Sequence, residues 1–131
     1  MVAYALVDRK VERGRRLIKK LDASGFPVTA AFWYYFPEAE QWRLVIASPT
    51  VESGGRHAAY TEIHRIQRRG LRAAPLSVSE ITAVSPHDPL VKLLSSAIRT
   101  GPGIVGIAFS GNVINGVHIE DAYIYRLSEA A

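Results

Sequence analysis

The sequence predicts a single α+β domain over residues 1–131, in which three amphipathic helices cover one face of a mainly antiparallel sheet of about five strands. Three observations predict this two-layer sandwich. Helical and strand-like hydrophobic patterns alternate along the 131 residues in the order α-β-β-α-β-α-β-β. Two pairs of strand-like segments are separated by short turns, which is typical of antiparallel hairpins. Each helical segment has one apolar stripe, which a sheet face would bury.

The composition narrows the class of protein. Hydrophobic residues make up 48% of the chain and charged residues 21%, which excludes general disorder. Because there is no Cys, a disulfide scaffold and a Cys-ligated zinc site are excluded. The longest apolar stretch, residues 28–36, is about half the ~20 residues that a membrane helix needs. The N-terminus is apolar before it is basic, the reverse of a secretory signal, so we expect a cytoplasmic protein without a membrane partner.

The first helix is expected over residues 8–24. Val11, Ile18 and Leu21 recur there at helical spacing and form one apolar stripe. Gly25 and the following Pro27 form a stop signal, so the helix should end just before them. We therefore expect this stripe to be buried against the sheet.

The middle of the chain predicts a hairpin followed by two further helices. Residues 28–36 and 41–48 are rich in β-formers and are joined by a short polar loop, so they should pair antiparallel. A second helix is expected over 56–70 and a weaker strand over 77–84. The third helix is expected over 90–99, where the preceding Asp-Pro supplies an N-cap and a proline in the first helical position.

The last third of the sequence predicts a second hairpin. Residues 104–109 and 122–127 have the β-branched and aromatic content of strands. Ser110-Gly-Asn112 is predicted to be the turn that follows the first of them. Asn115-Gly116 is a second turn signal within the same connection.

Basic residues concentrate in two helical segments. Seven of the 16 Lys and Arg lie in residues 9–20 and five lie in 56–72. If both helices pack on one side of the sheet, they form a positive patch that attracts phosphate backbones by counterion release, without base specificity. The alternative is two solvated helix faces in a chain that is rich in Arg and Ala. The residues expected to contact nucleic acid or an acidic protein are Arg9, Arg13, Arg16, Lys20, Arg65, Arg68, Arg69 and Arg72.

Aromatic residues occupy both faces of the strand over 28–36. A strand that is buried on one face should be polar on the other, so we expect Trp33 and Tyr35 on an uncovered face, with Arg43 as their neighbour. Exposed aromatics usually mark an interface, and this pattern predicts a homodimer through that face. Stacking on nucleic-acid bases and coverage by loops of the same chain are the alternatives.

Catalytic motifs are missing from the sequence, which contains no P-loop, nucleophile elbow, zinc-protease or dinucleotide fingerprint, and we expect no cofactor. One short cluster, His118, Glu120 and Asp121, has residue types that suit a divalent metal or general acid–base catalysis. The favoured prediction is a non-catalytic interaction domain that self-associates through its aromatic face and offers a basic helical face to an acidic partner. The alternative is a metal-dependent nuclease or hydrolase that uses the His118 cluster.

Overall fold

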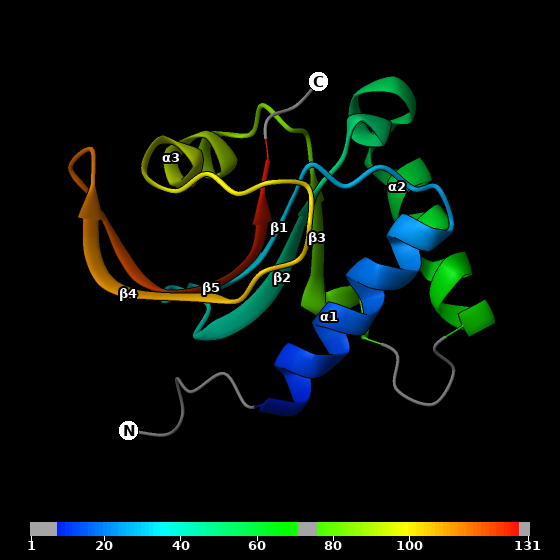
Figure 1. Ribbon diagram of the computed structural model, residues 1–131, viewed down its shortest axis with the longest axis horizontal. Helices are drawn as coiled ribbons and strands as arrows, with labels where there is room; N and C mark the ends of the chain where they lie inside the picture. Colours follow the sequence, from blue (N-terminus) through cyan, green and yellow to red (C-terminus); the bar gives the residue numbers. More distant parts are fainter. Residues whose placement is uncertain (1–7, 71–75, 129–131) are drawn as a thin grey trace.

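The structure is a computed structural model that describes residues 8–70 and 76–128. The α+β class and the predicted order of elements are confirmed (Figure 1). The elements are α1 (Asp8–Ala23), β1 (Ala30–Phe36), β2 (Gln41–Ala47), α2 (Pro49–Gly70), the short 3-10 helix η2 (Val78–Glu80), β3 (Ile81–Val84), α3 (Pro89–Ala97), β4 (Ile107–Ile114) and β5 (Val117–Leu127).

The five strands form one mixed sheet in the order β3-β2-β1-β5-β4. β1 pairs antiparallel with β2, placing Phe36 opposite Gln41 across the predicted hairpin, and β5 pairs antiparallel with both β1 and β4. β3 pairs parallel with β2, with Ile81 opposite Leu44. Two parallel neighbours need a crossover connection, and α2 supplies it. The sheet is therefore mainly antiparallel, as predicted, with one parallel edge.

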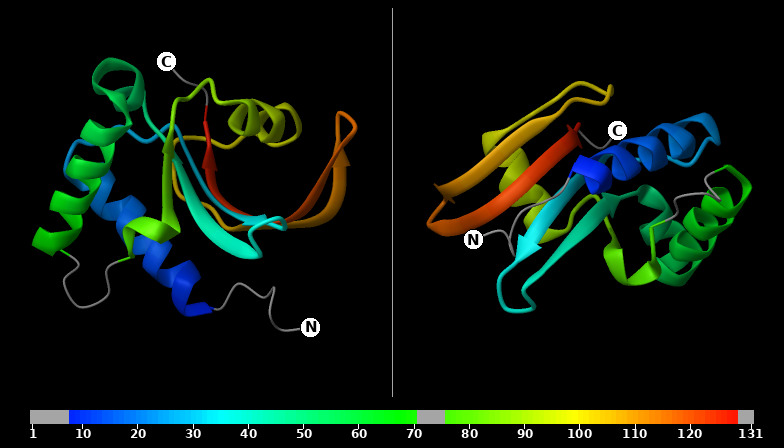
Figure 2. Two further views of the ribbon diagram at one scale, coloured as in Figure 1. Left: turned by 180° about the vertical axis from the view of Figure 1, so that it is seen from behind. Right: turned by 90° about the horizontal axis from the view of Figure 1, so that it is seen from below.

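Helices cover both faces of the sheet, which differs from the prediction that all three lie on one face. α1 and α2 pack over Trp33 and Leu44, whereas α3 packs on the opposite face over Phe32 and Val45. Figure 2 shows the sheet between these helices from behind and from below. The physical reason lies in β1, where every side chain from Ala30 to Tyr35 is buried, so both faces of the strand need an apolar cover.

α1 buries the apolar stripe that its sequence predicts. Leu17, Ile18 and Leu21 are fully buried, and Val11 packs half-buried against the same core. Gly14 lies where the helix comes closest to the sheet, since a Cβ at this position would stand 2.5 Å from the hydroxyl oxygen of Tyr125. The packing of α1 therefore depends on the absence of a side chain at this position.

A buried arginine joins the end of α1 to the sheet. Arg126, only 4% exposed, donates two hydrogen bonds to the carboxylate of Asp22, at 3.0 and 2.7 Å. It also donates to the carbonyl oxygens of Val28 and Gly103. Because a bidentate pair of this kind fixes orientation as well as distance, it holds the chain that leads from α1 into β1.

α2 begins earlier than the sequence predicts. A first helical segment starts at Pro49, and Gly55, with φ 85° and ψ 167°, joins it to the expected helix through a kink. After the kink, Ala59, Ile63 and Ile66 face the core. The polar stretch after Pro49, expected as a plain connection, thus contains helical turns.

The turn of the C-terminal hairpin lies at Asn115-Gly116 and not at residues 110–112. Asn115 and Gly116 both have positive φ, 49° and 81°, which is the geometry of a type I′ hairpin turn. β4 and β5 consequently run on past residues 110–112 as a long hairpin at the edge of the sheet. Figure 1 shows this hairpin curving away from the body of the sheet.

None of the helices in the described part of the chain is long and apolar enough to cross a membrane.

Candidate functional site

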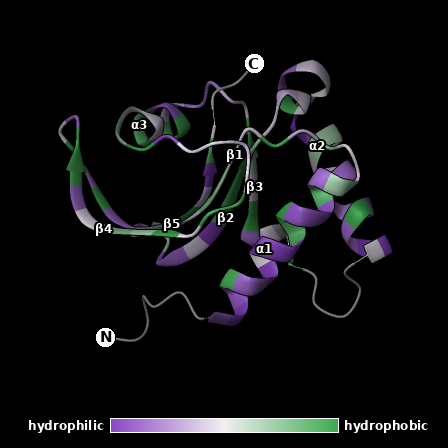
Figure 3. Cartoon of the chain, in the orientation of Figure 1, coloured by the Kyte–Doolittle hydropathy of each residue, from purple (hydrophilic) through white to green (hydrophobic). Residues whose placement is uncertain are grey.

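The predicted basic residues of α1 and α2 lie on the same side of the sheet, because both helices pack on one face. Together α1 and α2 carry eleven Lys and Arg against five Asp and Glu, whereas the rest of the chain carries five against seven. Figure 3 shows hydrophilic residues along both helices. We call the following set the basic face: Arg9, Arg13, Arg16, Lys20, Arg65, Arg68 and Arg69.

Three members of the basic face meet at a groove between the two helices. Lys20 from the last turn of α1 and Arg65 and Arg69 from the end of α2 line a cavity of about 280 Å³, together with Glu62. The side chain of Lys20 lies against Gly70, where an added Cβ would overlap it. The packing of the two helices therefore brings together cations that are 45 or more residues apart in sequence.

Most of the basic face has no acidic partner within the structure. Arg16 pairs with Glu12 along α1, at 3.3 Å, and Arg65 pairs with Glu62 along α2. Among residues 8–70 and 76–128, ion pairs are absent for the five remaining cations. These are Arg9, Arg13, Lys20, Arg68 and Arg69. Arg72, the eighth predicted residue, lies outside the described residues.

The aromatic residues expected on an uncovered face are buried inside the chain. Trp33 is 0% exposed and Tyr35 2% exposed. The Trp33 indole Nε1 donates to the hydroxyl of Tyr125 at 2.9 Å, and α1 covers both rings. The prediction of an interface through Trp33 and Tyr35 is therefore wrong, because α1 and α2 occupy the face that was expected to be open.

Arg43 also has a structural role. It donates to Thr82 Oγ1 and to the backbone oxygens of Ser79 and Ile81. These bonds join β2 to its parallel neighbour β3 and to η2. The guanidinium is therefore directed along the edge of the sheet and is not beside an exposed aromatic pair.

The His118 cluster is divided in space. His118 and Glu120 line a pocket of about 330 Å³ with Tyr34 and Leu90, whereas Asp121 does not line it. Within the described ranges, no group of three or more His, Asp or Glu side chains is arranged to hold a metal ion. The short sequence spacing thus does not become a metal centre in the fold.

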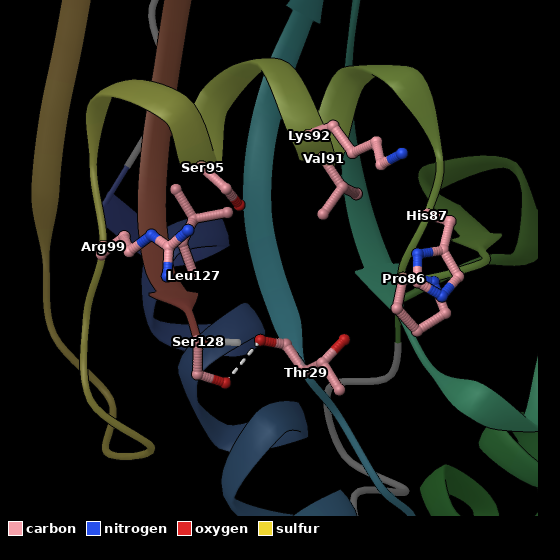
Figure 4. A pocket seen from close by; sticks show the side chains of 9 residues that line it. All are labelled: Thr29, Pro86, His87, Val91, Lys92, Ser95, Arg99, Leu127 and Ser128. Atoms are coloured by element: carbon pink, nitrogen blue, oxygen red, sulfur yellow. Dashed lines mark hydrogen bonds between the residues drawn. The ribbon is translucent and has the colours of Figure 1, made fainter. Parts of the chain in front are cut away.

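A pocket that sequence reasoning missed lies under α3 (Figure 4). This α3 pocket, with a volume of about 230 Å³, is formed by α3, by the Pro86-His87 turn before it, and by the ends of β1 and β5. Among the residues that the structure describes, its polar lining carries basic groups and hydroxyls and no carboxylate. The lining residues are Thr29, Pro86, His87, Val91, Lys92, Ser95, Arg99, Leu127 and Ser128.

Within the described residues, the interior leaves no side-chain nitrogen or oxygen unsatisfied. In the described part of the chain, every buried side-chain nitrogen and oxygen has a hydrogen-bond partner. The most perturbed titrating group, Tyr125, is structural, because burial raises the pKa of its hydroxyl against the opposing effect of the Trp33 hydrogen bond.

Comparisons with protein-family models, with curated proteins and with solved structures found no match for this chain.

Proposed function

We propose that this protein is a non-catalytic domain that binds an acidic partner, double-stranded nucleic acid, through the basic face of α1 and α2. The observation that carries the proposal is the meeting of Lys20, Arg65 and Arg69 at one groove. Cations that converge from two helices form a continuous positive surface, and such a surface attracts phosphate backbones.

The free cations of the basic face supply the binding energy. Five of its seven described members have no acidic partner in the described ranges, so a phosphate can replace their counterions without breaking an existing ion pair. Each phosphate neutralised adds about 0.9 to the slope of log K against log salt, so five contacts give a slope of roughly −4 to −5.

The aromatic side chains favour a duplex over a single strand. Single-strand binding usually stacks bases on exposed aromatic rings. Here Trp33 and Tyr35 are buried. On α2, Tyr60 is half-buried, and its hydroxyl accepts a hydrogen bond from the backbone N–H of Ala83. In the described part of the chain, the basic face thus offers cations without a stacking platform, which suits backbone contacts to a double helix.

The experiment is a fluorescence-anisotropy titration of a duplex of about 20 base pairs at several salt concentrations. Two double variants remove the same charge from opposite faces of the sheet: Lys20→Gln with Arg69→Gln on the basic face, and Lys92→Gln with Arg99→Gln at the α3 pocket. We expect the first pair to weaken binding at least tenfold and to reduce the salt slope by about two. The second pair should leave the slope close to that of the unmodified protein.

Two results would contradict this function. One is the absence of binding by the unmodified protein at about 50 mM salt, where backbone contacts are strongest. The other is an equal loss of affinity in the two double variants, which would mean that net charge alone governs retention of the duplex.

Self-association is a second candidate function, and the edge strand β4 favours it. Its eight residues, from Ile107 to Ile114, contain no charged residue and no proline, the usual devices that protect an edge. The exposed large hydrophobic residues of the described chain are Val105, Val113 and Val117, all within or beside the β4–β5 hairpin. A second copy that pairs its β4 with this edge would continue the sheet, and a two-fold axis would close the assembly.

Sedimentation velocity tests this second candidate with Val113→Lys, because a lysine on an edge strand opposes pairing with another strand. We expect the unmodified protein to be a dimer at tens of micromolar and the variant to be a monomer. Thr61→Lys, which adds the same charge on an exposed position of α2, is the matched control and should remain a dimer. A monomeric unmodified protein at about 100 μM would refute the pairing.

A further inference from the structure

We propose that the α3 pocket binds a small organic phosphate, a phosphate monoester about the size of glycerol phosphate. This inference goes beyond the proposed duplex binding, since the pocket lies on the opposite face of the sheet from α1 and α2.

Hydrogen bonds fix both walls of the pocket before any ligand enters. Ser128 joins the end of β5 to β1, because its backbone N–H and its hydroxyl both donate to the carbonyl oxygen of Thr29, at 3.0 and 2.8 Å. Thr100, next to the C-terminal end of α3, donates from its N–H to the carbonyl oxygen of Leu127 and accepts from the N–H of Leu127. The helix and the strand ends are therefore held at a set separation, which lowers the ordering cost of binding.

Among the described lining residues, the charged side chains of the pocket are all cations. Lys92 lies in the first turn of α3, Arg99 follows the end of that helix, and His87 closes one end. Figure 4 shows Arg99 and His87 at opposite ends, with Ser95 pointing down from the helix and Lys92 extending sideways from it. The carboxylate of Glu52 lies 3.8 Å from His87 Nε2, and Glu52 is not among the described residues that line the cavity. Such a lining attracts an anion of more than one charge.

The hydroxyls of the pocket divide into structural and available groups. Thr29 Oγ1 donates to the carbonyl oxygen of Ala47, and Ser128 Oγ donates to Thr29, so both protons are used within the fold. Ser95 is half-buried in the lining and donates no hydrogen bond to any residue of the described chain. Its hydroxyl, with the ammonium of Lys92, can therefore donate to phosphate oxygens, which are strong acceptors.

The volume of the α3 pocket and its apolar lining indicate what the ligand contains besides the phosphate group. The cavity of about 230 Å³ holds roughly eight groups the size of a water molecule, whose share of liquid volume is about 30 Å³. That space is larger than a phosphate ion, so it leaves room for a short carbon chain beside the phosphate. Val91 and Leu127 are almost fully buried at its floor and provide an apolar surface for a short carbon chain. A phosphate monoester of a three-carbon alcohol meets both conditions.

Isothermal titration calorimetry with glycerol 3-phosphate, at constant ionic strength, tests the proposal. The Lys92→Gln and Arg99→Gln double variant should weaken binding at least tenfold, whereas Lys20→Gln with Arg69→Gln should change it by less than twofold. Ser95→Leu blocks the cavity without changing charge and should also abolish binding. Inorganic phosphate, which lacks the carbon chain, should bind more weakly than the ester, and acetate more weakly still.

Three outcomes would overturn the proposal. The first is no heat of binding with about 20 mM glycerol 3-phosphate, well above the range of a specific site. The second is a loss of binding in the Lys20 and Arg69 variant that matches the loss in the Lys92 and Arg99 variant. The third is unchanged binding in Ser95→Leu. Circular dichroism verifies folding of each variant, and Lys92→Gln alone replaces the double variant if that protein does not fold.

Discussion

Gly14 governs how closely α1 packs on the sheet. Behind it, the Trp33 indole donates to the Tyr125 hydroxyl, which in turn donates to the carbonyl oxygen of Val11. This chain of hydrogen bonds joins β1, β5 and α1 at one buried point. Burial raises the pKa of Tyr125, so its hydroxyl keeps the proton that it donates to α1.

Gly14→Ala should lower the free energy of unfolding, although Ala is the better helix former by about 1 kcal/mol. The new Cβ would stand 2.5 Å from the Tyr125 hydroxyl and 2.8 Å from the Trp33 indole nitrogen. Overpacking of this kind typically costs 1–3 kcal/mol, so after the gain in helix propensity we expect a net loss of up to about 2 kcal/mol in urea denaturation.

A double-mutant cycle separates this steric effect from other causes. Tyr125→Phe removes the atom nearest to the new Cβ, so it should cost less stability in the Gly14→Ala background than in the unmodified protein. Additive effects of the two substitutions would show that the close contact does not limit the packing of α1.

Two carboxylates, Asp121 and Glu80, should make the free energy of unfolding depend on pH in opposite directions. Burial and then the charge of Glu120 raise the pKa of Asp121. At Glu80 burial also opposes ionisation, but hydrogen bonds from Lys10 and Ser77 outweigh it and lower the pKa. The contribution of Asp121 is therefore lost as pH rises through its folded-state pKa, and that of Glu80 is lost as pH falls through its own.

Denaturation of Asp121→Asn and Glu80→Gln at several pH values tests these signs. Near pH 7, Asp121→Asn should be more stable than the unmodified protein and Glu80→Gln less stable. The difference for Asp121→Asn should shrink as pH falls below about 3.8, the ordinary pKa of Asp, and the difference for Glu80→Gln should shrink as pH falls through the folded-state pKa of Glu80. A stabilising effect of Glu80→Gln at neutral pH would show that its bond to Lys10 does not favour folding.

At the scale of elements, local patterns predict the helices well and the second hairpin poorly. The stripe of Leu17, Ile18 and Leu21 is a property of one helix, so its periodicity is visible in the sequence. The hairpin turn was expected at residues 110–112 because Ser, Gly and Asn cluster there. The chain instead turns at Asn115-Gly116, which supplies the two positive φ angles of a tight hairpin.

The start of α3 offers a quantitative test at this scale. Asp88 caps the helix through its carboxylate, which accepts a hydrogen bond from the backbone N–H of Leu90 at 3.0 Å. Asp88→Ala removes this acceptor and should cost about 1 kcal/mol of stability, within the usual range of 0.5–2 kcal/mol. Asp88→Asn keeps an acceptor oxygen and should restore most of the loss in thermal denaturation. Equal stability of the Ala and Asn variants would mean that the cap contributes little.

At the scale of the whole molecule, the positions of helices relative to the sheet could not be predicted from local patterns. The prediction placed α3 with α1 and α2, although the apolar side chains on both faces of β1 already require cover on both sides. The parallel pairing of β3 follows from the helix between two strands, a signal that the weak alternation of residues 77–84 obscured.

Local sequence patterns also could not predict how the residues of the candidate sites come together. Each cation of the basic face was predicted from its own helix, but the meeting of Lys20 with Arg69 depends on how α1 packs beside α2. The α3 pocket combines residues from Thr29 to Ser128, almost the whole length of the chain, so no spacing pattern could indicate it. Whether Trp33 and Tyr35 are buried likewise depends on how the helices pack, which the local pattern of their strand does not indicate.

The central claim is that α1 and α2 form the surface that meets an acidic partner. Amide chemical shifts from ¹H–¹⁵N NMR, recorded while a short duplex is titrated at low salt, test it most directly because they report the position of contact residue by residue. We predict salt-sensitive shifts in the last turns of α1 and α2, around Lys20, Arg65 and Arg69, with α3 and β4 unaffected. Shifts confined to α3 or to the β4–β5 hairpin, or no shifts at low salt, would contradict the account.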